Sequence, residues 1–179
     1  MIHDFQQNLE YSLGVRERLD IDLLKGIIPD CTDIIKTEKK IDKKGIDYIA
    51  TLRRGAKINI DAKTRRPGAS KYWKYNEPEL ALEIWSSRPD IFNSGKTGWT
   101  LDEKSNVDYI LYTYDRSDTN KFFFVPFQLL RISFVNHFED WKSTYGVKKE
   151  NNKGWDSFAV FVPASVVCKE ITKLMSHEV

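Results

Sequence analysis

The sequence predicts a single α/β domain that spans residues 1–179. Its first part, residues 3–28, has apolar side chains at helical spacing and ends at Pro29. Three strand patterns separated by turn residues follow, and the last of them ends at residue 63. Near the C-terminus, two segments each read as an apolar strand, a Val-Pro pair and a helix. A chain of 179 residues with 41% hydrophobic residues suits one substantial core and is too short for two ordinary domains.

The first half of the chain contains most of the predicted strands. The run at 31–38 is expected to be a strand, and a charged turn leads from it into GIDYIATL at 45–52. The alternating run KINIDAK at 57–63 is the third strand. The segment ELALEIWSS at 79–87 fits either a short helix or a buried strand. The prolines on both sides of it favour the strand.

The second half is expected to extend the sheet and cover it. Residues 107–114 form a clear strand pattern. The two strand-to-helix units place helices at about 127–142 and 164–175, and these helices are expected to cover the sheet. Residues 146–153 between the two units read as a polar loop.

Two acids and a lysine stand out in the second and third strands. Side chains alternate along a strand, so Asp61 and Lys63 share one face, while Ile58, Ile60 and Ala62 share the other. In the preceding strand, one stripe comprises Ile46, Tyr48, Ala50 and Leu52, and the opposite side comprises Asp47, Ile49 and Thr51. The intervening RRGAK contains a glycine and has the length of a hairpin turn. The two carboxylates can therefore be neighbours.

Neighbouring buried carboxylates require a compensating charge. Two such groups repel one another, and burying them unpaired is costly, which makes a divalent cation the natural partner. Together with Lys63, Asp47 and Asp61 would then form a site suited to phosphodiester chemistry. The alternative is an exposed hairpin face on which Asp61 and Lys63 form only a weak surface pair.

The combination of GIDYIATL, a turn and INIDAK resembles the core of the PD-(D/E)xK nuclease superfamily, the restriction-endonuclease-like proteins, over about residues 5–114. The resemblance implies an αβββαβ core with a mixed central sheet flanked by helices, to which the C-terminal strand–helix units are additions. The predicted order of helix, strand, strand, strand agrees with the opening of that core. Ile46 stands where the family has the proline of its name, and Asp61 replaces the commoner glutamate.

The resemblance also assigns roles to these residues. Asp47 and Asp61 would bind Mg²⁺, with the carbonyl of Ala62 as a further ligand and Mn²⁺ as a substitute metal. Lys63 would assist the attacking water or stabilise charge on the phosphate. Many enzymes of this superfamily dimerise to cut both strands, so a DNA endonuclease that forms a homodimer is one expectation.

A third acid has several candidates. Nucleases of this superfamily often supply an acid from the first helix, and SLGVRERL resembles that element, which makes Glu17 the candidate and Glu10 the alternative. Glu17 also fits an ordinary charge at the edge of an amphipathic helix. If residues 79–87 form a strand, Glu83 can join the site as a ligand or as an acid behind the ligands.

Positive charge is concentrated around the predicted site. Residues 36–74 contain 13 Lys or Arg and 4 Asp or Glu, a net of +9, whereas the rest of the chain carries −7. Such a segment attracts a polyanion, although a solvated surface is the ordinary meaning of a lysine-rich stretch. The candidate nucleic-acid contacts interleave cations with an aromatic ring: Arg65, Arg66, Lys71, Trp73 and Lys74. The alternative is that the aromatic residues anchor a long loop to the core.

Other classes of protein have little support. Cys31 and Cys168 lie far apart and have no histidines at metal-ligand spacing, so neither a disulfide framework nor a zinc site is indicated. The three histidines do not suggest a Ser/His/Asp triad. No apolar run reaches the ~20 residues that cross a bilayer, and no signal-peptide pattern opens the chain. The expectation is a cytoplasmic protein without a membrane partner.

The sequence therefore predicts a magnesium-dependent nuclease that hydrolyses DNA. The rival is a noncatalytic nucleic-acid-binding module on the same scaffold, and a third reading is an interaction protein for which the +9 segment is incidental. The resemblance in fold does not predict the shape or the base sequence of the substrate.

Overall fold

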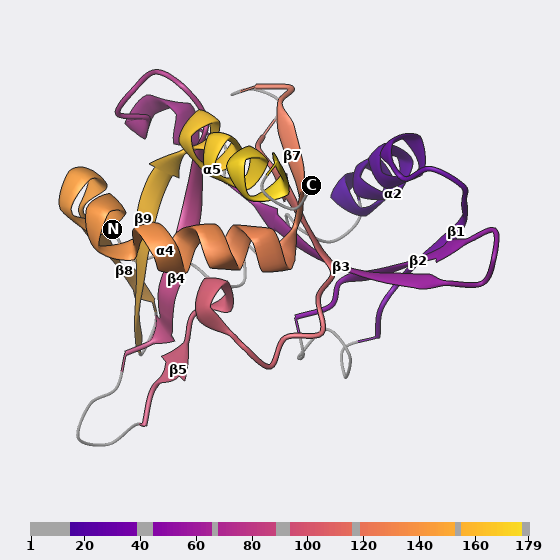
Figure 1. Cartoon of the computed structure of the whole chain (residues 1–179), viewed down its shortest axis with the longest axis horizontal. Helices are drawn as coiled ribbons and strands as arrows, with labels where there is room; N and C mark the ends of the chain where they lie inside the picture. Colours follow the sequence, from indigo (N-terminus) through magenta and orange to yellow (C-terminus); the bar gives the residue numbers. More distant parts are fainter. Residues whose placement is uncertain are drawn as a thin grey trace.

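The protein is a mixed α/β fold with two β-sheets and three α-helices among its described residues (Figure 1). The computed structural model describes residues 15–38, 45–65, 68–88, 94–115, 119–152 and 155–176.

The first sheet has five strands in the order β1-β2-β3-β6-β7. These strands are β1 (Cys31–Lys36), β2 (Tyr48–Leu52), β3 (Lys57–Thr64), β6 (Tyr109–Thr113) and β7 (Phe122–Pro126). Strands β3 and β6 are parallel, whereas the other neighbouring pairs are antiparallel, so the sheet is mixed. The predicted hairpin is confirmed as the β2–β3 pair, and Gly55 has a φ of 81° in its turn, a conformation that favours glycine.

The second sheet was not predicted as a separate sheet. It has four antiparallel strands in the order β5-β4-β9-β8, namely β5 (Lys96–Thr97), β4 (Glu79–Ser87), β9 (Trp155–Pro163) and β8 (Val147–Asn152). The preference for a strand at 79–87 is confirmed. The prediction of a polar loop at 146–153 is wrong, because Val147–Asn152 form strand β8. This strand lies at the edge of its sheet, where a polar sequence such as VKKENN is compatible with a strand.

Three helices pack on these sheets. Helix α2 (Val15–Ile27) lies beside the first sheet, while α4 (Phe127–Tyr145) and α5 (Ala164–Ser176) lie across the second (Figure 1). Both C-terminal helices begin directly after a proline, as the sequence predicts. None of the described helices combines the length and the apolar character needed to cross a bilayer.

Two hydrophobic cores cover the two faces of the first sheet. The small core, between α2 and the sheet, consists of Leu24, Ile28, Ile34, Tyr48, Ala50, Ile60 and Leu111. The large core lies on the opposite face and joins the first sheet to the second sheet, α4 and α5. Its members include Ile110, Tyr112, Leu80, Leu82, Val160, Val162, Leu130, Phe134, Val167 and Ile171. The face of β3 opposite Ile60 is therefore turned towards the second sheet.

The connection between β3 and β6 differs from the αβββαβ expectation. Its described residues contain β4, β5 and two short 3₁₀ helices, η1 (Ala69–Tyr72) and η2 (Trp99–Leu101), but no α-helix. The reason is that residues 79–87 pair with β9 over most of their length and so belong to a sheet.

Ile46 also departs from its predicted place. The alternation put it in one stripe with Tyr48 and Ala50, but Ile46 packs in the large core while those two residues pack in the small core. The regular pairing of β2 with β3 begins only at Tyr48, and the amide of Asp47 already bonds to the carbonyl of Ile60. The side-chain alternation therefore does not extend to Ile46.

Candidate active site

The predicted acids and lysine meet at the start of β2 and the end of β3. Asp61 is 3% exposed, and its Oδ1 accepts a hydrogen bond from Lys63 Nζ at 2.7 Å. The Oδ2 of Asp47 accepts a hydrogen bond from the backbone N–H of Ala62 at 2.7 Å. Ile58, Ile60 and Ala62 face the small core, as the alternation predicts. Asp47, Asp61 and Lys63 thus form the acid–lysine cluster.

The environment of the cluster raises the pKa of Asp47. Burial raises the pKa of Asp47 to about 6, and the nearby Asp61 carboxylate also raises it. The Ala62 N–H and the Lys63 ammonium oppose this shift without cancelling it. A buried carboxyl whose neighbour carries the same charge resists ionisation, and a cation placed between them would relieve that cost.

Lys63 remains a cation in this environment. Burial alone would lower its pKa, but the carboxylates of Asp61, Asp47 and Glu83 raise it above its usual value. The Lys63 ammonium also lies 5.7 Å from the centroid of the Trp99 ring, within the range of a cation–π contact. The acids and the ring therefore hold a positive charge beside Asp61.

Glu83 reaches the cluster from the second sheet. Its Oε2 accepts hydrogen bonds from Ser86 Oγ at 2.6 Å and from the backbone N–H of Trp99 at 3.3 Å. Its charge contributes to the raised pKa of Lys63. The structure thus brings Glu83 close to the predicted site. Glu83 faces the acid–lysine cluster because residues 79–87 form a strand.

Two tyrosines fix the second sheet against the first. The backbone N–H of Ala81 donates to the hydroxyl of Tyr112 at 2.9 Å, and the hydroxyl of Tyr114 donates to the carbonyl of Glu79 at 3.0 Å. Tyr112 lies directly opposite Lys63 in the β3–β6 register. These bonds place β4, and with it Glu83, beside the acid–lysine cluster.

Gly98 allows η2 to approach β4 at Glu83. Its N–H donates to the carbonyl of Ile84 at 2.8 Å, and a Cβ at Gly98 would lie 2.2 Å from the carbonyl oxygen of Glu83. The Gly98→Ala variant should therefore lose about 2–3 kcal/mol of unfolding free energy through overpacking. Urea denaturation measures the loss.

Gly26→Ala in α2 is the matched control, because no atom lies within 4 Å of its added Cβ. This exposed helical position should be neutral or gain about 0.5–1 kcal/mol. An unchanged denaturation midpoint for Gly98→Ala would contradict the close approach.

The donor set of the cluster suits a hard divalent cation. Mg²⁺ prefers oxygen ligands and commonly uses one or two carboxylates together with waters. Asp47 and Asp61 supply two adjacent carboxylates, one of them with a raised pKa, and Ala62 adds a backbone carbonyl beside them. No group of three His, Cys, Asp or Glu side chains with metal-binding geometry occurs within the described part of the chain. The residues fit a cation held by the acid pair and water.

Some predicted residues lie outside what the structure describes. Glu10 and Arg66 fall in ranges that are not described, and Glu17 is placed in α2 without a described side chain. The inward acid of α2 that is described is Asp20, which is 6% exposed and accepts a hydrogen bond from the Tyr48 hydroxyl at 3.2 Å. Asp20 thus lies on the side of the small core, where Tyr48 packs.

The predicted nucleic-acid contacts divide into surface cations and an anchor. Lys71 and Lys74 are exposed, and Arg65 is half-buried at the end of β3. Trp73 is also half-buried and packs edge-on against Tyr114 at 5.7 Å, which favours the anchoring alternative for this ring. The exposed rings of the loop include Tyr72, with 68% of its surface accessible, and Tyr75, with 45%.

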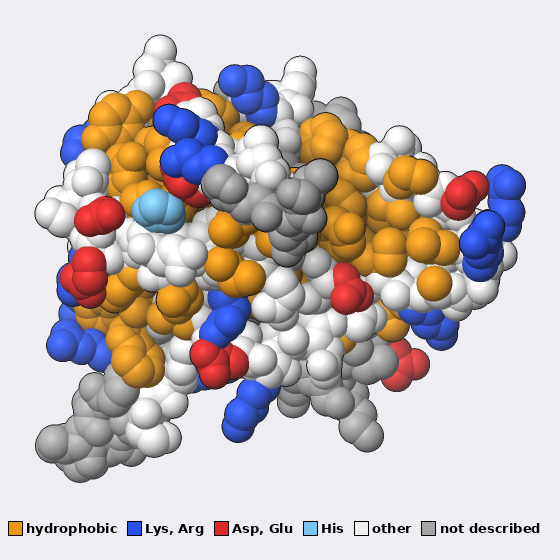
Figure 2. Space-filling view, in the orientation of Figure 1, with side chains coloured by type: hydrophobic (Ala, Val, Ile, Leu, Met, Phe, Trp, Pro, Cys, Tyr) orange, Lys and Arg blue, Asp and Glu red, His pale blue; other side chains and the backbone are white. Residues whose placement is uncertain are grey.

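Other basic side chains lie at the far end of the first sheet. Arg53 and Arg54 are exposed in the β2–β3 turn, and Figure 2 shows basic side chains gathered at that end of the molecule. The same view shows hydrophobic side chains over α2 and the adjoining strands. The described part of the +9 segment is therefore spread over both ends of the β2–β3 hairpin.

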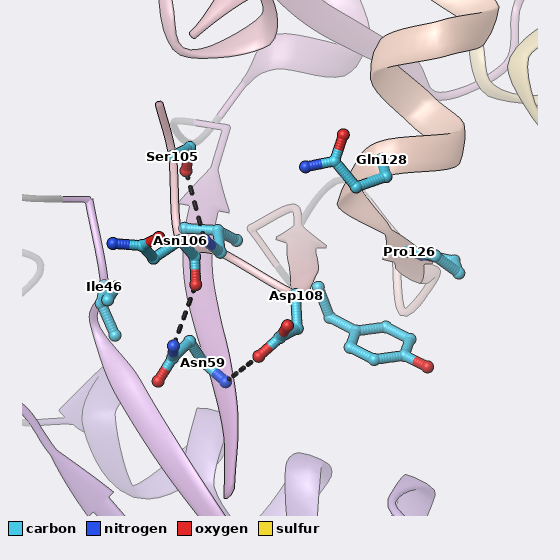
Figure 3. A pocket seen from close by; sticks show the side chains of 9 residues that line it. Ile46, Asn59, Ser105, Asn106, Asp108, Pro126 and Gln128 are labelled. Carbon is cyan, nitrogen blue, oxygen red and sulfur yellow. Dashed lines mark hydrogen bonds between the residues drawn. The ribbon is translucent and has the colours of Figure 1, made fainter. Parts of the chain in front are cut away.

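A hollow of about 800 Å³ has both polar and apolar side chains in its lining. Ile46, next to Asp47 in the chain, and Asn59, two residues before Asp61, line one side of it, and Gln128 lines another from the first turn of α4 (Figure 3). Asn59 Nδ2 donates to the carbonyl of Asn106 at 2.9 Å. The lining combines amide groups with one acid, Asp108, and does not include the three residues of the acid–lysine cluster.

Sequence reasoning missed three parts of the site. The ring of Trp99 makes a cation–π contact with Lys63, and the hydroxyl of Tyr112 accepts a hydrogen bond from β4. A single aromatic residue in an apolar sequence pattern does not indicate either contact. Lys148, which lies over the ring of Phe161, was assigned to a loop. The sequence of β8, VKKENN, has no alternation of apolar and polar residues that could have signalled a strand.

No protein-family model, curated protein or solved structure matches this chain.

Proposed function

We propose that this protein is a magnesium-dependent nuclease that hydrolyses phosphodiester bonds in DNA. The observation that carries the proposal is the acid–lysine cluster, in which Asp47 and Asp61 lie together and Lys63 is hydrogen-bonded to Asp61. Adjacent carboxylates with a fixed cation are what a metal-assisted attack on a phosphate requires.

The chain's own residues have separate tasks in this reaction. Asp47, Asp61 and the carbonyl of Ala62 would hold Mg²⁺, which supplies an activated water and polarises the phosphoryl group when it is bound. The ammonium of Lys63 would stabilise the charge that develops on the phosphate and orient the attacking water. Its raised pKa supports this cationic role. Glu83 adds to the negative charge that keeps Lys63 a cation, and Glu17 or Glu83 would bind a second cation.

The arrangement of elements supports the resemblance to PD-(D/E)xK nucleases. Helix α2 and the antiparallel strands β1, β2 and β3 follow one another in the order that opens the restriction-endonuclease-like core, and the acids lie on β3 and at the start of β2. In the described residues, the crossover from β3 to β6 runs through strands of a second sheet and contains no α-helix, which is a departure from that core.

The surroundings of the cluster suit a polyanionic substrate. Arg65 lies two residues beyond Lys63, directly after β3, and exposed Lys71 and Lys74 follow in the next segment. The hollow lined by Ile46 and Asn59, which lie close to Asp47 and Asp61 in the chain, leaves room for part of a nucleotide. Cations around an acidic metal centre raise the local concentration of phosphates, which the acids alone would repel.

Cleavage assays test the proposal directly. Purified protein is incubated with plasmid, linear duplex, branched and single-stranded DNA in Mg²⁺, in Mn²⁺ or in chelator. We expect cleavage of at least one substrate with either metal and none with chelator, because the acid pair cannot polarise a phosphate by itself. Absence of cleavage from every substrate, or cleavage that survives the chelator, would contradict the proposal. Metal-independent binding without cleavage would favour the noncatalytic binding module.

A further inference from the structure

Two cations converge on one buried ring beside the acid–lysine cluster. The guanidinium of Arg65 lies 4.6 Å from the centroid of the Phe161 ring, and the ammonium of Lys148 lies 4.4 Å from it. Phe161 itself is 5% exposed. The ring therefore fixes two positive charges that come from β3 and β8.

Neither cation has an acidic partner within ion-pair distance among the described side chains. The next residue of β8, Lys149, differs, since its Nζ bonds to Asp156 at 2.7 Å. Two like charges held near one ring repel each other, and an anion bound between them would relieve that repulsion. Glu150, two residues beyond Lys148 on the same face of β8, acts on Tyr112 together with Arg65 but forms no ion pair with either cation among the described side chains. Room for an external anion therefore remains at the pair.

The strand registers place Lys148 on the same face of the second sheet as Glu83. Glu83 pairs with Ala159, which in turn pairs with Lys148, so the three side chains form one row across the second sheet. Two strand spacings put Lys148 about 10 Å from Glu83 along the backbone. Ala81 pairs with Phe161 on the same face. Arg65 directly follows β3, and its amide continues the pairing with β6 by donating to the carbonyl of Thr113 at 2.9 Å. The alternation therefore extends to Arg65 and places it on the face of Lys63, two residues earlier.

We propose that Arg65 and Lys148 form a phosphate clamp that holds a non-scissile phosphate of the nucleic acid next to the bond that is cut. Phe161 acts as a positioning residue, because its ring aims both cations. The inference rests on the proposed nuclease function for the location of the scissile phosphate, at Asp61 and Lys63. It extends the substrate path from the first sheet onto the second sheet.

The clamp can be tested by the salt dependence of DNA binding. The Asp61→Asn variant serves as a cleavage-deficient background, and fluorescence anisotropy gives Kd for labelled duplex DNA at several salt concentrations in metal-free buffer. Each of Arg65→Ala and Lys148→Ala should lower the slope of log K against log salt by about 0.9 and weaken binding about five- to tenfold at 0.1 M salt. The loss should be the same for unrelated DNA sequences.

Matched variants separate the clamp from general charge loss. Lys149→Ala removes the same charge from the neighbouring position and should leave the slope unchanged, since that ammonium pairs with Asp156. Phe161→Leu keeps both cations but removes the ring, so it should weaken binding while the slope changes less. Thermal melts confirm that each variant is folded. An unchanged slope in the Arg65→Ala, Lys148→Ala double variant, or no DNA binding by the background protein, would overturn the clamp.

The clamp and the nuclease function can fail independently. A reduced slope together with no cleavage by the unaltered protein in Mg²⁺ would keep the clamp and reject the nuclease. Cleavage in Mg²⁺ together with an unchanged slope would keep the nuclease and reject the clamp.

Discussion

Replacing Asp61 with Asn should reduce the rate of Mg²⁺-dependent DNA cleavage by a factor of about 10³ or more, which corresponds to about 4 kcal/mol of transition-state stabilisation. Asp61 is the more buried of the two acids and is bonded to Lys63. Asparagine keeps the size of the side chain but removes the charge that a divalent cation needs. Single-turnover assays with the cleaved substrate measure the loss.

Lys63 should matter through its charge rather than through a proton it gives up. Lys63→Ala is expected to lower the single-turnover rate by a factor of about 10² to 10³, as for other electrostatic stabilisers of a transition state. Lys63→Arg keeps a cation and should restore part of the rate.

Glu139→Gln is the matched control for this series, because it removes an exposed acid of α4 that pairs only with Lys142 among the described residues. It should cleave at the rate of the unaltered protein. Full Mg²⁺-dependent activity in a folded Asp61→Asn protein would reject the site.

Replacing Asp47 with Asn should abolish cleavage and at the same time stabilise the metal-free protein near pH 8. The pKa of Asp47 is raised from its ordinary value of 3.8 to about 6, first by burial and then by Asp61. The folded state therefore binds more protons than the unfolded state between these values, and its stability falls as the pH rises through this range. Above pH 6 the full cost is present, about 2 kcal/mol for a shift of this size after some relaxation of the site.

Asparagine removes this cost without removing the backbone contact, since its Oδ1 can still accept the Ala62 N–H. The melting temperature of Asp47→Asn should exceed that of the unaltered protein by about 4–8 °C at pH 8, and the difference should shrink towards pH 4. Added Mg²⁺ should raise the melting temperature of the unaltered protein and not that of the variant.

Differential scanning calorimetry across pH, with and without Mg²⁺, provides the measurement. Asp108→Asn is the control, because Asp108 is an exposed acid that also accepts a backbone N–H, that of Asn59. It should gain no stability at pH 8. A lower melting temperature for Asp47→Asn than for the unaltered protein at that pH would contradict the electrostatic account.

The hairpin and its acids could be predicted because their signals are local. Gly55 marks the turn, and the period of two along β3 assigns Asp61 and Lys63 to one face and Ile60 to the other. Asp47 interrupts an apolar run that is separated from β3 by only a short turn, so the sequence itself identifies β3 as the partner strand. These features require no knowledge of the rest of the fold.

The pairing of the strand that carries Glu83 could not be predicted, because its partner is a distant segment. Glu83 lies opposite Ala159 in β9, and no local pattern in ELALEIWSS identifies that partner. The edge strand β8 was read as a loop because an edge exposes most of its side chains, so its sequence is polar. Lys148 therefore became visible as a member of the site only through the structure.

The tyrosine contacts between the sheets have a consequence for how the site can diversify. Strand pairing within each sheet fixes Asp61 relative to Lys63 and Glu83 relative to Lys148, but the separation of these two halves is set by the hydroxyl groups of Tyr112 and Tyr114. A related sequence can thus change the distance between the two halves of the proposed site by altering these phenols or the large core, while every proposed site residue keeps its own strand and register. The identity of the site residues and the spacing of the two halves are separately adjustable in this architecture.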